Sequence, residues 1–149
     1  MRKQLLLSLF IAIPALMAVP LASAQTVATA HADTLVKSES SWNGVKYVAY
    51  PSTSPQLTVI KLTIPAHTAL PWHKHPVPNA GYVLAGQLTI EDRESGRKKT
   101  FTTGQAFAES VNDVHRGISG DVPTVLILTY SGSKGTPTSI PVDSKQPEY

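Results

Sequence analysis

The sequence predicts an all-β protein, a single domain of antiparallel strands packed as a sandwich or barrel. From Val45 onward, apolar stretches of strand length alternate with turn residues. Outside the first 24 residues, no window carries the 3.6-residue apolar period of a helix for more than a turn or two. We find neither a repeat of solenoid spacing nor a sign of a second domain.

The first 24 residues are expected to be a secretory leader rather than part of the fold. Arg2 and Lys3 precede an apolar run over residues 5–21, and Ala22 and Ala24 occupy the small-residue positions of a cleavage site. Prolines interrupt the run, which is short for a bilayer span. We therefore expect cleavage after Ala24, a periplasmic or secreted mature protein, and no membrane attachment after cleavage.

The mature chain would carry little net charge and no sulfur. Loss of Arg2 and Lys3 takes the formal charge from +3 to about +1, and no basic stripe suited to nucleic acid is present. There is no cysteine, and both methionines, Met1 and Met17, lie in the leader. A metal site here must therefore use histidine, carboxylate, amide or backbone ligands.

The rest of the chain divides into an extension, a barrel and a tail. Residues 25–44 form an N-terminal extension of small and polar residues that adds at most an edge strand, and residues 45–131 form the barrel. Residues 132–149 are rich in glycine, serine and proline, as is typical of a tail. The strands expected in the barrel cover residues 45–50, 56–64, 81–92, 100–110 with a turn at Gly104, and 123–130.

Two histidines stand side by side before an apolar strand. His73 and His75 are two residues apart, so on a strand both imidazoles point the same way, and Pro71 and Pro76 restrict the backbone around them. His115 comes later, but strands distant in sequence become neighbours in a barrel. The alternative is a solvated pair and a hydrogen-bonded core histidine. The spacing of His73 and His75, taken together with His115, favours a site for a divalent transition metal (Fe, Mn, Ni, Zn or Cu).

These residues resemble the two sequence motifs of the cupin superfamily, and the resemblance covers most of the mature chain. It is carried by His73 and His75 in the H-x-H of the first motif, Gly86 at its closing glycine, and Gly104 and His115 at the family's spacing in the second. The chain is thus identified as similar to a small, single-domain, exported cupin. The resemblance implies the cupin double-stranded β-helix, a jelly-roll-like antiparallel barrel with the metal in its mouth.

The chain departs from the family's motifs at several positions. Asn79 stands where the family has a glutamate ligand, so the resemblance implies Asn79 as a neutral and weaker metal ligand. His67 stands where the first motif of the family begins with a glycine. Asn112 replaces a glycine of the second motif, where asparagine tolerates a left-handed backbone. Ser110 and Ser119 replace the proline and asparagine of the same motif.

Glu109 is the candidate replacement for the missing carboxylate. It lies two residues after Phe107, which should face the core, so its side chain should point to the same face. A carboxylate inside a barrel needs a cation or a strong donor. Glu109 would then be a fourth ligand or a catalytic acid–base group; the alternative is a bend that turns it to solvent. Trp72 and Arg116, each next to a histidine, should face away from the metal.

The sequence favours an exported metal-dependent enzyme that acts on a small organic molecule. By resemblance to three-histidine cupins that hold iron, it would be an oxygenase (a dioxygenase) whose substrate binds through an oxygen donor. The alternatives are a non-catalytic binder of a metal or small ligand, and a fold without a working site. The expected partner is a small molecule and not a nucleic acid; a homodimer through edge strands is open, as small cupins commonly dimerise in this way.

Overall fold

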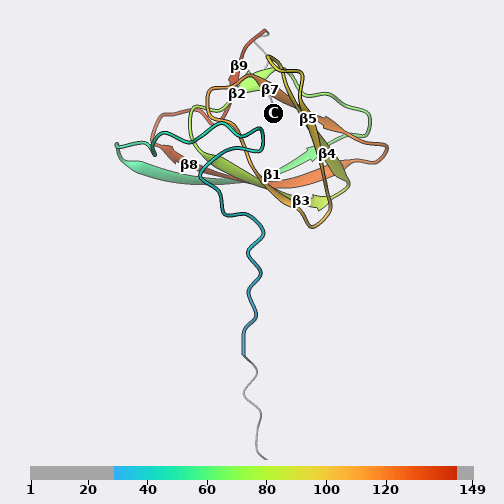
Figure 1. Cartoon of the computed structure of the whole chain (residues 1–149), viewed down its shortest axis with the longest axis horizontal. Helices are drawn as coiled ribbons and strands as arrows, with labels where there is room; N and C mark the ends of the chain where they lie inside the picture. Colours follow the sequence, from blue (N-terminus) through green and yellow to red (C-terminus); the bar gives the residue numbers. More distant parts are fainter. Residues whose placement is uncertain (1–28, 144–149) are drawn as a thin grey trace, which may run out of the picture. The chain divides into compact units, whose positions relative to one another are not determined.

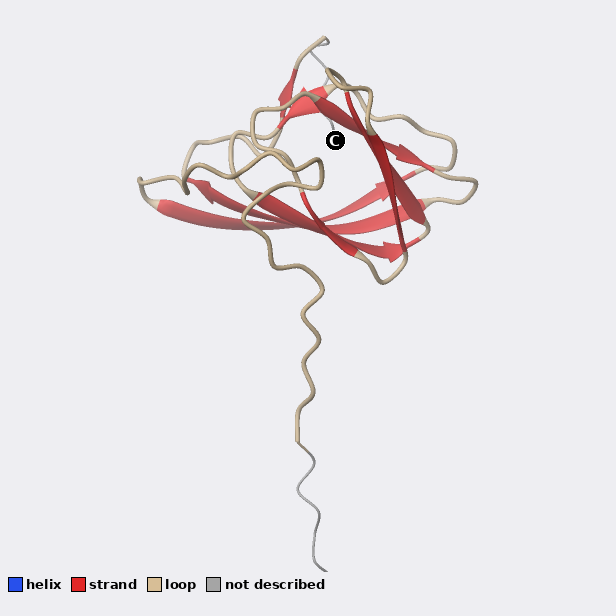
Figure 2. Cartoon of the chain, in the orientation of Figure 1, coloured by secondary structure: helices blue, strands red, loops and turns tan. Residues whose placement is uncertain are grey.

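The computed structural model describes residues 29–143, which are coloured in Figure 1. The predicted leader, residues 1–24, lies outside the described residues. Contacts divide the chain into two units, residues 1–32 and 33–149, and the described residues of the first unit form no regular structure. Figure 2 shows the described part as strands and loops. It contains no helix that is long and apolar enough to cross a membrane.

The strands of the second unit form two antiparallel sheets, as predicted for an all-β fold. One sheet has the order β1-β8-β3-β6 and the other the order β5-β4-β7-β2-β9, and Figure 1 shows them as separate layers. The strands are β1 (Pro55–Ile64), β2 (His73–Lys74), β3 (Asn79–Ala85), β4 (Gln87–Asp92), β5 (Lys98–Thr102), β6 (Ala106–Ala108), β7 (His115–Ser119), β8 (Thr124–Ser133) and β9 (Ile140–Pro141).

The hydrophobic core lies between the two sheets. In β1 the side chains alternate between the two faces of the sheet, because Leu62 and Ile64 are buried while Leu57 and Val59 are exposed. The other sheet contributes buried side chains from β4 and β5. The buried apolar residues are Leu62, Ile64, Val77, Val83, Leu88, Ile90, Phe101, Phe107, Leu126, Leu128 and Tyr130. Each sheet therefore presents one apolar face to the other, as in a packed jelly roll.

Two glycines lie where the chain passes from one sheet to the other. Gly104 (φ 90°) separates β5 from β6, as the predicted turn requires, whereas Gly86 (φ 78°) separates β3 from β4 within a stretch predicted to be one continuous strand. A Cβ on Gly86 would lie 2.6 Å from the backbone oxygen of Pro123, so no other residue fits there. Apolar periodicity continues across such a crossing, which is why sequence analysis did not detect it.

Both ends of the predicted barrel also differ from expectation. The expected strand at 45–50 is absent; its backbone makes one isolated bridge, from Lys46 to Ser40. At the other end, β8 continues to Ser133, and β9 lies within the expected tail and pairs with β2. The segment after β8 therefore returns to the strand that carries His73.

Candidate metal centre

Three buried histidines converge from two neighbouring strands. His73 in β2 is the register partner of His115 in β7, and His75 follows β2 and forms a bridge with Val111. Each histidine is at most 1% exposed, and one ring nitrogen from each lies within 4.8 Å of the others. The structure thus confirms that the three histidines predicted from the sequence lie together.

Backbone carbonyls determine which ring nitrogen each histidine directs to the centre. The Nδ1 atoms donate to the oxygens of Pro71 (His73, 2.8 Å), Thr138 (His75, 2.7 Å) and Asp113 (His115, 2.9 Å). A carbonyl can only accept, so the proton is on Nδ1, and a neutral imidazole then has its lone pair on Nε2. This is the orientation that a histidine needs to bind a metal through Nε2.

Burial keeps the imidazoles of His73 and His115 neutral. It lowers the pKa of His73 to about 3, with help from repulsion by His115 and His75. Burial also lowers the pKa of His115, although the charge of Glu109 opposes this shift. Neutral imidazole is the form that binds metals, so His73 and His115 do not have to lose protons at neutral pH before they bind a cation.

Glu109 points into the barrel beside two of the histidines. It is 7% exposed, its Oε2 lies 3.0 Å from Nε2 of His75, and its Oε1 lies 3.8 Å from Nε2 of His115. The predicted inward orientation is confirmed, and the alternative of a solvent-facing bend is wrong. Burial raises the pKa of Glu109, but the electrostatic attraction of the neighbouring histidines, His75 first, outweighs burial and holds this pKa at about 2.

The contact between Glu109 and His75 requires a cation. Because Nδ1 of His75 donates to Thr138, a neutral ring would turn a lone pair toward the carboxylate only 3.0 Å away. Two lone pairs at that distance repel unless a proton or a metal ion lies between them. Either cation stabilises the ionised carboxylate, and this is why we assign Glu109 the charged form.

Asn79 also lies on the interior face, but the structure does not decide whether it is a ligand. It is 7% exposed and is the register partner of Tyr130, whose ring centroid is 5.5 Å from that of His75. Its amide atoms have no hydrogen-bond partner among the described residues. Register partners share a face of the sheet, so Asn79 points toward the site, and its role as a metal ligand stays a prediction.

Two residues at glycine positions of the family motifs have left-handed backbones. Asn112 has φ 65°, as predicted, and its N–H donates to the backbone oxygen of His75 (2.9 Å). His67 has φ 53°, but its side chain is 72% exposed and pairs with Asp121 at 3.7 Å. His67 is therefore not part of the metal cluster.

The residues next to the histidines face outward, as predicted. The guanidinium of Arg116 lies 4.3 Å from the centroid of the Trp72 ring, and its Nε donates to Glu91 (2.7 Å). Lys98 pairs with the other oxygen of Glu91 at 2.9 Å. These contacts belong to the outer face of the five-stranded sheet, away from the metal cluster.

Sequence analysis missed three residues that contact the cluster or Glu109. Thr138 acts through its backbone oxygen, Tyr130 through ring contact with His75, and Tyr47 through its hydroxyl, which donates to the backbone oxygen of Glu109 (2.7 Å). Burial and the charge of Glu109 raise the pKa of Tyr47 to about 12. A backbone carbonyl leaves no residue signature, so no sequence pattern could have identified Thr138.

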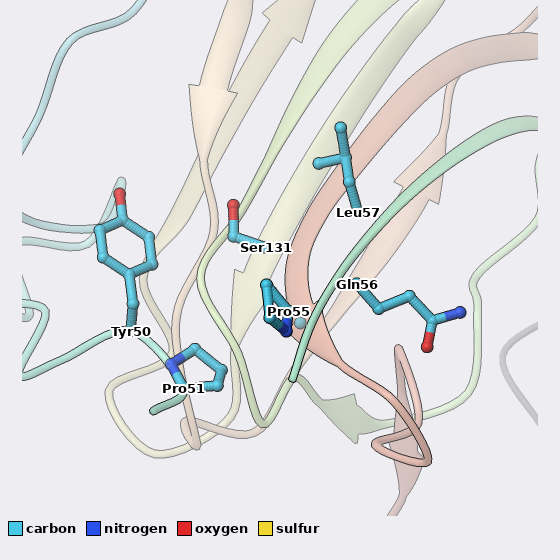
Figure 3. A pocket seen from close by; sticks show the side chains of 7 residues that line it. Tyr50, Pro51, Pro55, Gln56, Leu57 and Ser131 are labelled. Carbon is cyan, nitrogen blue, oxygen red and sulfur yellow. The ribbon is translucent and has the colours of Figure 1, made fainter. Parts of the chain in front are cut away.

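Five cavities open on the described surface, and none of the five is lined by a histidine of the cluster. One, of about 300 Å³, lies at the start of β1 beside Tyr50 and Pro51. Figure 3 shows its lining, which includes Leu57 and Ser131. It belongs to the outer side of the four-stranded sheet, so ligands in it would not reach the three imidazoles.

Comparison with known proteins gives a match to a family model over part of the chain, and a fold. The model of the cupin domain family (Cupin_2) matches residues 60–130. Among solved structures, the chain is similar to the DMSP lyase DddQ from Ruegeria pomeroyi, with 19% identity and a TM-score of 0.53 over 60% of this chain and 45% of the lyase. It is also similar to the polyketide cyclase RemF from Streptomyces resistomycificus, with 16% identity and a TM-score of 0.52 over 66% of this chain and 68% of the cyclase.

A third similar structure is an oxalate decarboxylase from Lactobacillus farciminis (16% identity, TM-score 0.51, 58% of this chain and 26% of that one). This chain spans under half the length of the lyase and of the decarboxylase. No curated protein matches the sequence. At these identities the likenesses show the fold alone, which is the predicted antiparallel jelly-roll barrel.

Proposed function

We propose that the chain, whose residues 60–130 match the cupin domain family model, is a small single-domain cupin and a metal-dependent enzyme that acts on a small organic molecule. The metal is a divalent ion held by His73, His75 and His115. The reaction class that we propose is oxygenation, with the substrate bound through an oxygen donor.

The observation that carries this proposal is the convergence of three Nε2 lone pairs beside an ionised carboxylate. The Nδ1 protons of the three imidazoles are bound by backbone carbonyls, which turns each Nε2 toward the centre, so the donor set fits a divalent transition metal. A cation held by neutral imidazoles would serve as a strong Lewis acid and, as iron, would support reaction with dioxygen. Three protein ligands leave coordination positions for a substrate.

Glu109 is the residue that we assign to proton transfer. Its pKa of about 2 makes it a carboxylate at neutral pH, so it accepts a proton rather than donates one in the resting site. Its two oxygens lie 3.0 Å from His75 and 3.8 Å from His115, within reach of a molecule bound at the cluster. Buried apolar side chains such as Phe107 and Val83 exclude water from the same interior.

Export is part of the proposal and is supported by the leader-like residues 1–24. The mature protein would work outside the cytoplasm, in the periplasm or after secretion. We propose a small-molecule ligand as its partner. Pairing of two copies through edge strands is the form of assembly that an unprotected strand would favour.

A second candidate function is binding of a metal or small ligand without catalysis. The histidines are at most 1% exposed, and none of the five surface cavities reaches them. A site closed in this way favours retention of a bound group over turnover. The solved structures that are similar in fold include a lyase, a cyclase and a decarboxylase, so the fold does not decide the reaction.

Oxygen uptake distinguishes the two functions. The mature protein, residues 25–149, would be loaded with Fe²⁺ without air and then given oxygen with small diketones, phenols or organic acids. We expect uptake that requires both iron and one class of substrate and that is lost in zinc-loaded protein. Iron-loaded protein that consumes no oxygen with any of these compounds would contradict the oxygenase proposal and favour the binder.

A further inference from the structure

We propose that the C-terminal segment Thr138–Asp143, which we call the strap, positions His75 for metal binding. The backbone oxygen of Thr138 accepts the Nδ1 proton of His75 at 2.7 Å, so the strap determines that the lone pair of His75 lies on Nε2. The inference rests on the proposed function, because it assumes that the three histidines bind a metal. It adds that metal affinity depends on a segment that contributes no metal ligand.

The three histidines differ in where their carbonyl partners come from. His73 and His115 donate to carbonyls only two residues away, at Pro71 and Asp113, so their own loops hold these rings. His75 donates to a carbonyl 63 residues further along the chain. If the strap moves away, His73 and His115 keep their partners and His75 alone loses its hydrogen bond. The orientation of one ligand is thus controlled at long range.

The strap is attached to the strand that carries the histidines. Its strand β9 pairs with β2 at the edge of the five-stranded sheet, and Figure 1 draws the two strands side by side. Beyond β9, the N–H of Val142 donates to the oxygen of Trp72 (3.0 Å), and Asp143 pairs with Arg93 (2.6 Å). These contacts bring the oxygen of Thr138 to the imidazole of His75.

Trp72 connects the strap to the outer face of the sheet. Its ring lies under two guanidinium groups, those of Arg116 at 4.3 Å and Arg93 at 5.7 Å from the ring centroid. Arg93 also makes the ion pair with Asp143, so the same arginine contacts both the ring and the strap. Since the residue after Trp72 is the ligand His73, the strap is held at the backbone that leads into the site.

The strap is held weakly enough for metal binding and strap closure to affect each other. β9 has only two residues, and the ion pair joins side chains that are 45% and 49% exposed. A short edge strand with solvent-exposed contacts opens at low free energy. By linkage, a metal that is bound more tightly with the strap closed must stabilise the closed strap by the same factor.

The test compares chains that end at different residues. One chain ends after Pro137 and lacks the strap; its control ends after Asp143 and keeps it. Affinity for Zn²⁺ would be measured by chelator competition. Loss of an outer hydrogen-bond partner of a metal-bound histidine lowers metal affinity about 10- to 100-fold, and we expect this loss in the chain ending after Pro137 and none in the control.

Nitrogen NMR of the three histidines provides a readout that loss of general stability would not change. In metal-free full-length protein we expect Nδ1–H for all three rings. In the chain ending after Pro137, the signal of His75 should shift toward the form with its proton on Nε2, facing Glu109, while His73 and His115 keep Nδ1–H. Equal zinc affinity in the two chains, or an unchanged His75 signal, would overturn the inference.

A point substitution serves if the shortened chain does not fold. Val142→Pro keeps the whole chain, Thr138 included, but removes the N–H that donates to Trp72 and so loosens the strap. Val142→Ala keeps that N–H and is the matched control. We expect several-fold weaker zinc binding in Val142→Pro only; equal affinities contradict the inference. If the full-length chain binds no zinc, the proposed function is contradicted. If it binds zinc with an affinity that does not depend on the strap, only this inference is contradicted.

Discussion

The carboxylate of Glu109 lies 3.0 Å from Nε2 of His75 inside the barrel, and both side chains are buried. Nδ1 of His75 already donates to Thr138. The facing nitrogen and oxygen are therefore both lone-pair atoms, and a cation must lie between or beside them. Several consequences of this arrangement can be measured.

Replacement of Glu109 should weaken metal binding without unfolding the barrel. Glu109→Gln keeps the shape of the side chain and removes a negative charge next to the cation. We expect metal affinity to fall about 10- to 100-fold, the range found for residues that support metal ligands. Glu94→Gln, at an exposed position, is the control and should match the wild type. If Glu109→Gln binds metal as tightly as the wild type, the charge does not contribute to the site.

The metal-free protein should lose stability as the pH falls below about 6.5. The folded state holds the pKa of His73 at about 3, against 6.5 for an ordinary histidine. The unfolded chain therefore binds more protons throughout this window, so the free energy of unfolding decreases with falling pH. For this group alone, the loss between pH 7 and pH 5 is about 2 kcal/mol.

Urea unfolding at pH 7 and pH 5 measures this loss. His73→Asn should flatten the pH dependence, whatever its effect on absolute stability. His67→Asn, which replaces a histidine whose side chain is 72% exposed, is the control and should keep the wild-type slope. A wild-type slope in His73→Asn would show that His73 is not held neutral by burial.

A methyl group on Gly81 should destabilise the fold by clashing with Phe107. A Cβ at position 81 would lie 2.1 Å from Cζ of the Phe107 ring, which is buried in the core. Overpacking of this kind costs about 1–3 kcal/mol. Gly81→Ala should therefore unfold at lower urea concentration, and Phe107→Leu should recover part of the loss in the double variant. Additive effects of the two changes would contradict the clash.

The left-handed backbone at Asn112 predicts an order of stabilities. With φ 65°, glycine should be tolerated and alanine should cost about 1–2 kcal/mol. Thermal unfolding of Asn112→Gly and Asn112→Ala would show this order. Since the N–H of Asn112 donates to the oxygen of His75, the alanine variant should also bind metal less tightly. Equal stability of the two variants would show that this turn is not strained.

Local patterns were sufficient to predict much of the fold and the three histidines. The apolar residues of 56–64 and the turn residues around them identified β1, and the i, i+2 spacing of His73 and His75 placed both rings on one side of the chain. The inward orientation of Glu109 followed from its spacing to Phe107. Each of these inferences uses only the two-residue period of an extended chain.

Features that depend on distant partners could not be predicted. Apolar alternation runs through Gly86 without a break, although the chain changes sheets there. Residues 132–149 have the composition of a tail, yet β9 pairs with β2 because a sheet edge beside the site is available. Every residue has a backbone carbonyl, so the sequence does not indicate that the carbonyl of Thr138 accepts a hydrogen bond from His75. Whether Asn79 binds the metal depends on side-chain geometry that spacing does not give.

Metal titration of the mature protein tests the central claim most directly. Wild type, His115→Gln and His67→Gln would be freed of metal, titrated with Zn²⁺ and checked by elemental analysis. We predict about one tightly bound ion per chain in the wild type and in His67→Gln, as expected for a single cluster of imidazoles, and binding at least about 100-fold weaker in His115→Gln. Equal binding in all three proteins would contradict a centre built from His73, His75 and His115.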